Sequence, residues 1–390
     1  MTKPERTRRE QAVPTRVVLV FQGGGALGAY QAGVFEALQA QGIEPDWVIG
    51  TSIGAVNGAL IAANPPALRV SRLREFWERV RSPRLLPPML PMPAQTSELI
   101  NNLSTLTRGL PGFFTPNPAA WFGGVHALLG LKQAAFYSTD DLRETLTELT
   151  DFSLLESADA MRLSLGAVNV RTAQMRYFDS RRDETPLGID HVLASGALPP
   201  AFPAVMIEGD PWWDGGIVSN TPIEAIFDDS ERGDALVFAV NLWQVDGQEP
   251  SSIWDTAGRM KDIQYASRAD SHIADEKERQ HLRRVIAELA QLLPDEAREQ
   301  AREAGLLDEA QTGTLHIARL FAPALDGETH TKDIDFSEKG IRERWDAGFA
   351  DASRMLEMAP WLTPCDRLDG IQVYTLEGLD EQIPEQAVRG

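Results

Sequence analysis

The chain has 390 residues, of which 43% are hydrophobic and 24% are charged. This is the composition of an ordinary globular protein, so a collagen-like or wholly disordered chain is excluded and a sizeable core is expected. Acidic residues outnumber basic ones by 57 to 37, and the resulting net charge of −20 argues against a nucleic-acid partner. The single cysteine, Cys365, excludes an internal disulfide framework.

The sequence pattern predicts neither a membrane span nor a signal peptide. No stretch approaches the ~18 consecutive apolar residues that a membrane span requires. The first 15 residues are polar, and the apolar run after them, residues 17–21, is too short for a signal peptide. We therefore expect a disordered tail over residues 1–15 and a cytoplasmic protein, with peripheral contact to a membrane left open.

The first predicted elements form a compact strand–helix–strand–helix unit. Residues 16–22 are an apolar, β-branched run that ends at a glycine cluster, which indicates a buried parallel strand. Residues 26–40 predict a helix, residues 47–50 a second strand, and residues 53–63 a helix of small residues that stops before a proline pair. This order predicts an α/β fold with a mainly parallel sheet.

A proline-rich, apolar segment, residues 82–136, interrupts this pattern. Its prolines exclude one continuous helix, while its Leu, Met, Phe and Trp residues argue against a solvated linker. We expect an insertion packed over one end of the sheet, either as an irregular packed loop or as a lid or lipid-facing surface. The side chains that could line an apolar channel there are Leu90, Met92, Leu110, Phe113, Phe114, Trp121 and Phe122.

Regular structure is predicted again beyond the insertion. Residues 162–170 and 236–242 indicate buried strands, residues 253–309 charged helices, and residues 314–321 a last strand. A helix near residues 336–358 and a polar tail complete the chain. In the charged helical region, one helix face carries the apolar side chains Leu282, Val285, Ile286, Leu289 and Leu293.

A G-x-S-x-G pentapeptide directly follows the second predicted strand and directly precedes a helix. It comprises Gly50, Ser52 and Gly54 with one residue between each pair. A serine on such a sharp turn stands exposed above the sheet at the positive end of the helix, and the glycines leave room for the tight backbone path. The pattern indicates a nucleophilic serine, although a tight turn that only needs small residues would look the same.

A glycine cluster lies between the first predicted strand and its helix, at Gly23, Gly24, Gly25 and Gly28. Successive N–H groups there can point at an anion, helped by the helix N-terminus. The spacing also fits the dinucleotide-binding fingerprint, but that fingerprint expects an acidic residue at the end of the second strand, where this chain has the serine turn. No lysine completes a P-loop, so an oxyanion hole is the better assignment.

A nucleophilic serine needs a group that takes its proton. Asp214 is the best candidate, because Gly215 and Gly216 make a turn that exposes the carboxylate and apolar neighbours such as Trp213 would raise its pKa. His191 lies in a predicted helix, and we interpret it as a packed or surface residue. No obvious catalytic turn holds any of the six histidines, which are His126, His191, His272, His281, His316 and His330.

Taken together, these motifs resemble the patatin-like phospholipases. The ordered set of blocks is highly specific and comprises residues 23–28, 50–54, 194–203 and 214–216. It covers about residues 17–241, and the region downstream is similar, more weakly, to the long C-terminal extension of one bacterial subgroup. The resemblance implies a three-layer α/β/α sandwich, with residues 16–245 as the catalytic domain and residues 246–390 as a mostly helical extension packed on it.

The resemblance also implies roles for the motif residues. In this family a serine attacks an acyl ester and an aspartate alone serves as the base, which implies a dyad of Ser52 and Asp214. The loop of Gly23, Gly24 and Gly25 would hold the oxyanion. Family members commonly carry Arg or Lys where this chain has Leu27, so backbone N–H groups would do this without that nearby cation. The motifs would be supported by Gly28, Gly50, Gly54, Gly215 and Gly216.

The leading hypothesis is a serine acyl hydrolase that cleaves fatty-acyl esters in lipid metabolism. One alternative keeps the dyad but takes a short hydroxyacyl ester, an oligoester or a thioester. Another is a non-enzymatic phosphate-binding protein, which the serine turn after the second strand disfavours. We expect no cofactor and no metal, because acidic residues near histidines, such as Asp333 and Asp335 near His330, are typical of solvated loops. The oligomeric state is left open.

Overall fold

The computed structural model describes residues 16–380 except residues 83–104, 106, 124–127, 230–232, 248, 267, 326–327, 329, 365 and 367. The predicted tail, residues 1–15, lies outside the described residues, as do Leu90 and Met92 of the predicted apolar channel. Within the described ranges, no helix is both long enough and apolar enough to cross a membrane.

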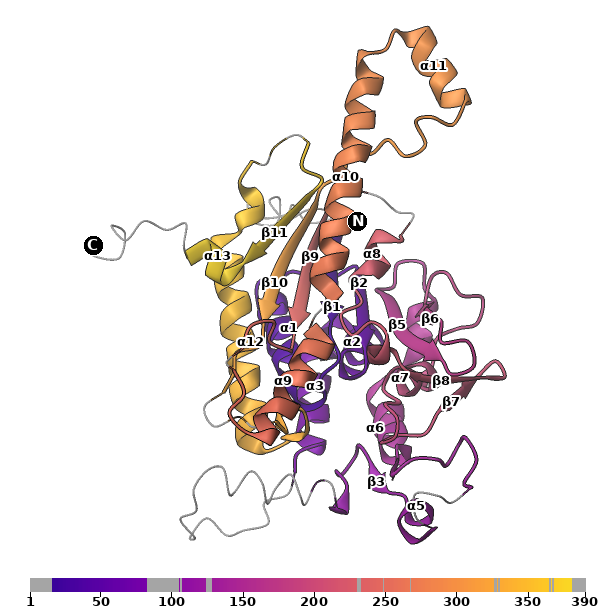
Figure 1. Ribbon diagram of the computed structural model, residues 1–390, viewed down its shortest axis with the longest axis vertical. Coiled ribbons are helices and arrows are strands. Elements are labelled where there is room, and N and C mark those ends of the chain that lie inside the picture. Colours follow the sequence, from indigo (N-terminus) through magenta and orange to yellow (C-terminus); the bar gives the residue numbers. More distant parts are fainter. Residues whose placement is uncertain are drawn as a thin grey trace, which may run out of the picture.

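A nine-stranded sheet forms the centre of the molecule (Figure 1). Its order is β11-β10-β9-β1-β2-β5-β8-β7, and β6 pairs with β5 beside this path. Pairings among β1, β2, β5, β9, β10 and β11 are parallel, whereas those of β6, β7 and β8 are antiparallel. The strands are β1 (Arg16–Phe21), β2 (Trp47–Thr51), β5 (Arg162–Asn169), β6 (Met175–Asp179), β7 (Val205–Ile207), β8 (Asp210–Asp214), β9 (Ala235–Asn241), β10 (Leu315–Phe321) and β11 (Ile371–Thr375).

Helices cover both faces of this sheet. One core lies between the sheet and α1 (Ala29–Ala40), α2 (Ile53–Ala62), α3 (Arg69–Arg79) and α12 (Glu338–Met358). A second core lies on the opposite face, under α8 (Glu224–Phe227) and α10 (Arg268–Leu292). Alternate residues of β1 enter these two cores, as the two-residue period of a strand requires. The predicted three-layer α/β/α sandwich with a mainly parallel sheet is confirmed.

The remaining helices and one small hairpin surround this sandwich. The described helices are α5 (Pro118–Gly123), α6 (Asp140–Leu149), α7 (Ile189–Ser195), α9 (Ile253–Ala266), α11 (Asp295–Glu303) and α13 (Leu376–Asp380), with the short 3₁₀ turns η2 (Gly25–Gly28) and η6 (Lys332–Ile334). The hairpin joins β3 (Thr115–Pro116) to β4 (Tyr137–Ser138) within and just after the predicted insertion.

The C-terminal region takes part in the sheet as well as in the helical layers. β10 pairs with β9, and β11 pairs with β10, so both strands extend the sheet that contains β1. The C-terminal half of α10 and all of α11 project beyond the body of the molecule (Figure 1). Leu282 and Leu289 are more than half exposed on this arm, because α10 buries its other face, which includes Ala269, Ile273 and Ala287.

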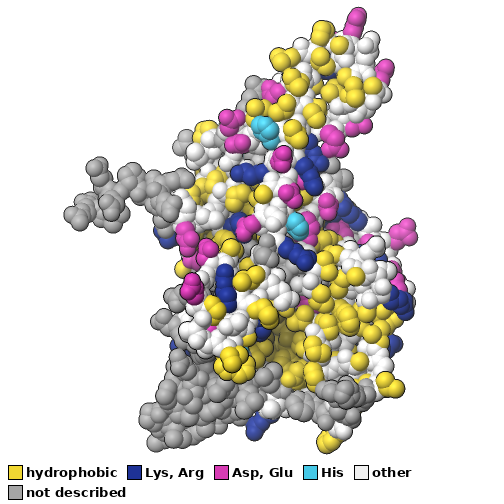
Figure 2. All heavy atoms as spheres, in the orientation of Figure 1, with side chains coloured by type: hydrophobic (Ala, Val, Ile, Leu, Met, Phe, Trp, Pro, Cys, Tyr) yellow, Lys and Arg dark blue, Asp and Glu magenta, His cyan; other side chains and the backbone are white. Residues whose placement is uncertain are grey.

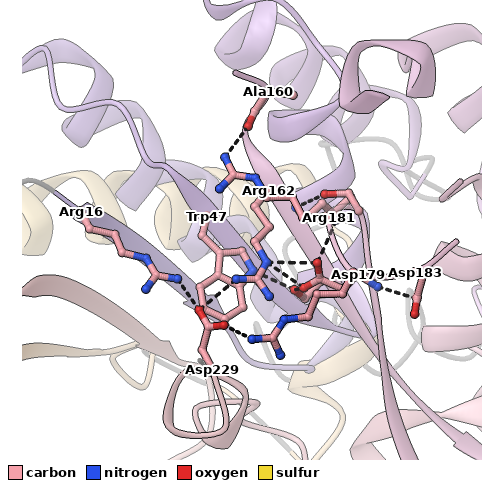
Figure 3. Close-up of polar contacts among 12 residues, drawn as sticks. Arg16, Trp47, Ala160, Arg162, Asp179, Arg181, Asp183 and Asp229 are labelled. Carbon is pink, nitrogen blue, oxygen red and sulfur yellow. Dashed lines mark hydrogen bonds and ion pairs between the residues drawn. The ribbon is translucent and has the colours of Figure 1, made fainter. Parts of the chain in front are cut away.

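A buried cluster of charges ties together the amino ends of three parallel strands (Figure 3). Asp229 accepts hydrogen bonds from Arg16 at 2.6 Å, from Arg162 at 2.9 Å and from Arg182. Arg162 also binds Asp179 through its Nε and lies over the indole ring of Trp47, 3.9 Å from the ring centroid. Burial alone would raise the pKa of Asp229, but its arginine partners hold that pKa below the ordinary value.

Breaking this cluster should destabilise the fold. Asp229→Asn leaves the buried Arg162 with one carboxylate fewer, so the unfolding free energy should fall by about 3 kcal/mol at pH 7 in urea titrations. Because the pKa of Asp229 is lowered in the folded state, its contribution is present above the unfolded pKa and is lost as the pH falls through the folded pKa. The difference from wild type should therefore shrink in acid.

The exposed pair of Arg171 and Asp210 provides a matched control. Both side chains are about half exposed, so Asp210→Asn should change the unfolding free energy by less than about 1 kcal/mol. Equal losses in the Asp229 and Asp210 variants would contradict the role given to the buried cluster.

Candidate active site

Ser52 occupies the sharp turn between β2 and α2. Its φ of 57° and ψ of −123° lie in a region that residues with a side chain rarely adopt. The Ser52 N–H donates to the backbone oxygen and to the Oγ of Ser195, both at 3.1 Å, and this Oγ donates to the Gly166 carbonyl at 2.6 Å. These bonds hold the turn in its strained conformation.

The two glycines of the serine motif are required by close backbone contacts. A Cβ atom on Gly50 would collide with the carbonyl oxygen of Gly54. A Cβ atom on Gly54 would collide with the carbonyl oxygen of Phe21, at the end of β1. The turn therefore fits against β1 only because both positions lack side chains.

Asp214 ends β8, and its side chain is buried. β8 pairs with β5, which in turn pairs with β2, so the sheet brings Asp214 to the same edge as Ser52. The carboxylate accepts a hydrogen bond from the Gly216 N–H at 2.7 Å, and the Ser52 side chain lies near enough to influence its pKa. Burial raises the pKa of Asp214 to about 7, although the Ser52 side chain and the Gly216 N–H act in the opposite direction. Gly215 packs against the Gly166 carbonyl, where a Cβ would collide.

The glycine loop lies directly beside Ser52. A Cβ atom on Gly23 would come within 3.0 Å of the Ser52 Cβ, and one on Gly28 would collide with Ile53. The Gly23 N–H donates to the Asn220 carbonyl at 3.1 Å, so it is already used within the protein. Gly25 has a φ of 55°, which favours glycine.

These groups line one cavity of about 190 Å³ with largely apolar walls. Gly23, Gly24, Gly25, Ser52 and Asp214 lie together along it. Its walls come from segments far apart in the sequence, and they include Ile53, Val56, Phe113, Phe114, Ile334 and Phe336. The structure thus brings together the proposed nucleophile, base and oxyanion loop of the sequence analysis.

The residues that line this cavity lie largely in a segment that is similar to a known protein family. The sequence model of the patatin-like phospholipase family matches residues 19–227, which is more than half of the chain. The chain belongs to the patatin-like phospholipase family. A second model, described as patatin phospholipase, matches residues 263–368.

Several family members with curated functions are similar to this chain. The lysophospholipase NTE1 of Kluyveromyces lactis is 26% identical over 241 residues, which are 62% of this chain and 13% of the relative. The cGAMP-activated phospholipase of Pseudomonas aeruginosa is 27% identical over 221 residues, 54% of this chain and 55% of the relative. The chain therefore spans less than two thirds of the length of these relatives. The crystal structure of VipD from Legionella pneumophila aligns over 92% of this chain and 72% of that one, with 13% identity and a TM-score of 0.38.

In the part of the chain that the structure describes, no histidine lines the cavity that holds Ser52. His191 accepts a hydrogen bond from the Gly188 N–H through Nδ1 at 3.0 Å, and its ring packs edge-on against Phe178. Burial lowers the pKa of His191. His330 stacks on the indole ring of Trp254, with 4.5 Å between the ring centroids. Within the same described ranges, no group of three or more His, Cys, Asp or Glu side chains is placed to hold a metal ion.

The predicted apolar channel is present in part. Phe113 and Phe114 line the cavity and form an aromatic cluster with Phe202, with ring centroids 5.5–6.4 Å apart. Leu110 is buried outside the cavity lining, and Phe122 is 93% exposed. The side chain of Trp121 lies outside the described residues. The described part of the insertion is therefore both a packed loop and a wall of the cavity.

Sequence reasoning missed several residues around the site. Ser195 and Asn220 hold the serine turn and the glycine loop, and both lie in or next to motifs that the sequence had singled out. Gln22 and Trp243 carry no local signal, because each acts through contacts with residues about 200 positions away in the chain.

The raised pKa of Asp214 predicts a pH-dependent stability. A carboxyl whose pKa is raised by folding contributes stability below its unfolded pKa, and this contribution is lost as the pH rises through the folded pKa near 7. The loss between pH 4 and pH 8 should be on the order of 4 kcal/mol. Asp214→Asn has no charge to bury, so it should unfold at higher urea concentration than wild type at pH 8 but not at pH 4. A constant difference between the two proteins at both pH values would contradict this prediction.

Proposed function

We propose that this chain hydrolyses acyl esters of lipids with a Ser52–Asp214 dyad. The observation that carries the proposal is that Ser52 lies in one cavity with the glycine loop and with the buried carboxylate of Asp214, whose pKa burial raises to about 7. A base with such a pKa can hold a proton and release it near neutral pH, which is what general acid–base catalysis requires. The apolar walls of the same cavity support a fatty-acyl substrate.

The reaction would proceed through an acyl-enzyme. Asp214 takes the hydroxyl proton as the Ser52 Oγ attacks the acyl carbonyl carbon, and the carbonyl oxygen becomes an oxyanion. When the tetrahedral intermediate collapses, the ester bond breaks and Asp214 gives its proton to the leaving alcohol. Water then attacks the acyl-enzyme with the same assistance, which releases the fatty acid and restores Ser52.

The oxyanion would be held by backbone N–H groups. The Gly23 N–H already donates to Asn220, so the donors we assign are the N–H groups of Gly24 and Gly25. Such preorganised donors act where charge develops in the transition state. Leu27 is buried in the core, so no cation at that position assists them.

The lipid substrate would reach Ser52 from the protein surface around the cavity. α9 exposes the apolar side chains Ile253, Trp254, Met260 and Ile263, each more than half exposed. Tyr265, at the end of the same helix, lines the cavity. Hydrophobic side chains also gather at the lower centre and right of the face in Figure 2. These features support peripheral contact between this face and a lipid surface.

Removal of the nucleophile gives the first test of the proposal. Ser52→Ala should abolish ester hydrolysis and labelling by a fluorophosphonate probe, which in wild type should modify Ser52. Only a hydroxyl at a turn is removed, so the unfolding free energy should change by roughly 1 kcal/mol or less. Turnover that persisted in a folded Ser52→Ala protein would exclude Ser52 as the nucleophile.

Asp214 and the histidines give the second test. Asp214→Asn keeps the side-chain shape but removes the proton acceptor, so kcat should fall on the order of 10²-fold or more. In wild type, kcat/KM should rise with pH through an apparent pKa near 7 as Asp214 ionises. His191→Gln and His330→Gln should retain turnover. If either histidine variant were inactive and Asp214→Asn nearly normal, a Ser–His mechanism would replace the dyad.

The chain length of the substrate gives the third test. Phe113 is half-buried and lines the cavity, and each buried methylene of an acyl chain contributes about 0.8 kcal/mol. Phe113→Gln should therefore raise KM for p-nitrophenyl decanoate far more than for the acetate. Phe349→Gln, on α12 and away from the cavity lining, should leave both values unchanged.

The same panel of esters separates the alternatives. A wild-type preference for acetyl or hydroxybutyryl esters over long-chain esters would favour the short-ester alternative with the same dyad. Equal loss on short and long esters in Phe113→Gln, at an unchanged melting temperature, would place the acyl site elsewhere.

A further inference from the structure

Two buried side chains bind the carbonyl oxygen of Gly23. The indole Nε1 of Trp243 donates to this oxygen at 2.7 Å, and the Nδ2 of Asn220 donates to it at 3.0 Å. Trp243 is 3% exposed and Asn220 is 7% exposed, so water does not compete for these bonds. The orientation of the peptide group between Gly23 and Gly24 is therefore fixed from its oxygen side.

The orientation of this peptide group decides where the next N–H points. A peptide bond is planar and almost always trans, so the N–H of Gly24 points opposite to the C=O of Gly23. Gly23, Gly24 and Ser52 border the same cavity. We propose that Trp243 and Asn220 are positioning residues for the reaction, which aim the Gly24 N–H at the oxyanion; this inference rests on the proposed function.

Trp243 is itself held in place by the end of β1. The Oε1 of Gln22 accepts hydrogen bonds from the N–H groups of Leu242 and Trp243, the second at 3.1 Å. The Nε2 of Gln22 donates to the Thr221 Oγ1 at 2.6 Å, one residue after Asn220. One buried glutamine thus links the segments that carry the two positioning residues to the strand that leads into the glycine loop.

The glycine loop also fits closely against these residues. A Cβ atom on Gly24 would come within 2.9 Å of Leu242 and within 3.2 Å of the Trp243 Nε1. The Tyr265 ring packs against the indole of Trp243, with 4.9 Å between the ring centroids. These contacts and the hydrogen bond to the Gly23 carbonyl hold the indole against the glycine loop.

Trp243→Phe tests this inference, because it keeps an aromatic ring but removes the N–H donor. Deleting an oxyanion donor itself costs about 10²–10³-fold in kcat, so loosening one should cost less, about 10-fold, with KM changed less than twofold. The inhibition constant of a long-chain alkyl trifluoromethyl ketone should rise by a similar factor. Its carbonyl carbon forms a bond to the Ser52 Oγ, and its oxygen becomes an oxyanion like that of the intermediate.

Trp47→Phe is the matched control for a merely structural effect. The Trp47 Nε1 donates to the Ser164 Oγ at the same distance, 2.7 Å, at the amino ends of the strands. Both variants should lower the melting temperature, but only Trp243→Phe should lower kcat and weaken the ketone. If Trp243→Phe changed kcat no more than Trp47→Phe does, Trp243 would not be a positioning residue.

Asn220→Ala provides a second test, because it removes the other side chain that donates to the Gly23 carbonyl. It should also lower kcat about 10-fold, and the double variant should lose more than either single one, because both side chains hold one oxygen. The proposed function fails if Ser52→Ala still hydrolyses esters. The inference alone fails if Ser52 and Asp214 are essential while the folded Trp243→Phe and Asn220→Ala proteins keep the wild-type kcat.

Discussion

The strained backbone of Ser52 is the constraint on which the site depends. A φ of 57° for a serine costs on the order of 1–3 kcal/mol and persists only where the surroundings enforce it. Here β1 and α2 approach so closely that Gly54 touches the end of β1, and Ser195 holds the Ser52 N–H from the other side. The parallel pairing of β1 and β2 then brings the glycine loop beside the serine without further adjustment. The strained turn and the position of the glycine loop beside Ser52 are both consequences of this close approach.

Two buried aspartates show how the same sheet produces opposite electrostatics at its two ends. At the amino ends of the strands, arginines surround Asp229 and hold its pKa below the ordinary value despite burial. At the carboxyl ends, Asp214 is equally buried but has only Ser52 and the Gly216 N–H to favour its charged form, so burial dominates and its pKa rises to about 7. The difference is the presence or absence of a cation partner. A compensated buried charge stabilises the fold, whereas an uncompensated one costs stability.

The elements that could be predicted from the sequence are those with a local pattern of their own. Apolar runs that end in glycines located β1 and β2, and the serine turn between β2 and α2 followed from them. β8, which carries Asp214, was not predicted, because its five residues include a proline and two adjacent tryptophans and show no alternation. β11 was not predicted either. It lies at the edge of the sheet, where it pairs with β10. Trp243 could not be found from sequence, because its contact with Gly23 joins residues 220 positions apart.

The cavity also explains why the region after β9 matters to the candidate site. Residues 19–227 carry the serine, the aspartate and the glycine loop, but Trp243, Tyr265, Ile334 and Phe336 complete the cavity from beyond that range. The Asp333 carbonyl packs so closely on Gly25 that no side chain could fit there, and Lys261 holds the Asp333 carboxylate at 2.8 Å. These contacts come from α9 and η6, which are anchored by the same C-terminal region that adds β10 and β11 to the sheet. The C-terminal region therefore shapes the cavity along which the family motifs lie, and differences in this region offer a physical route to different cavity shapes around an unchanged Ser52 and Asp214.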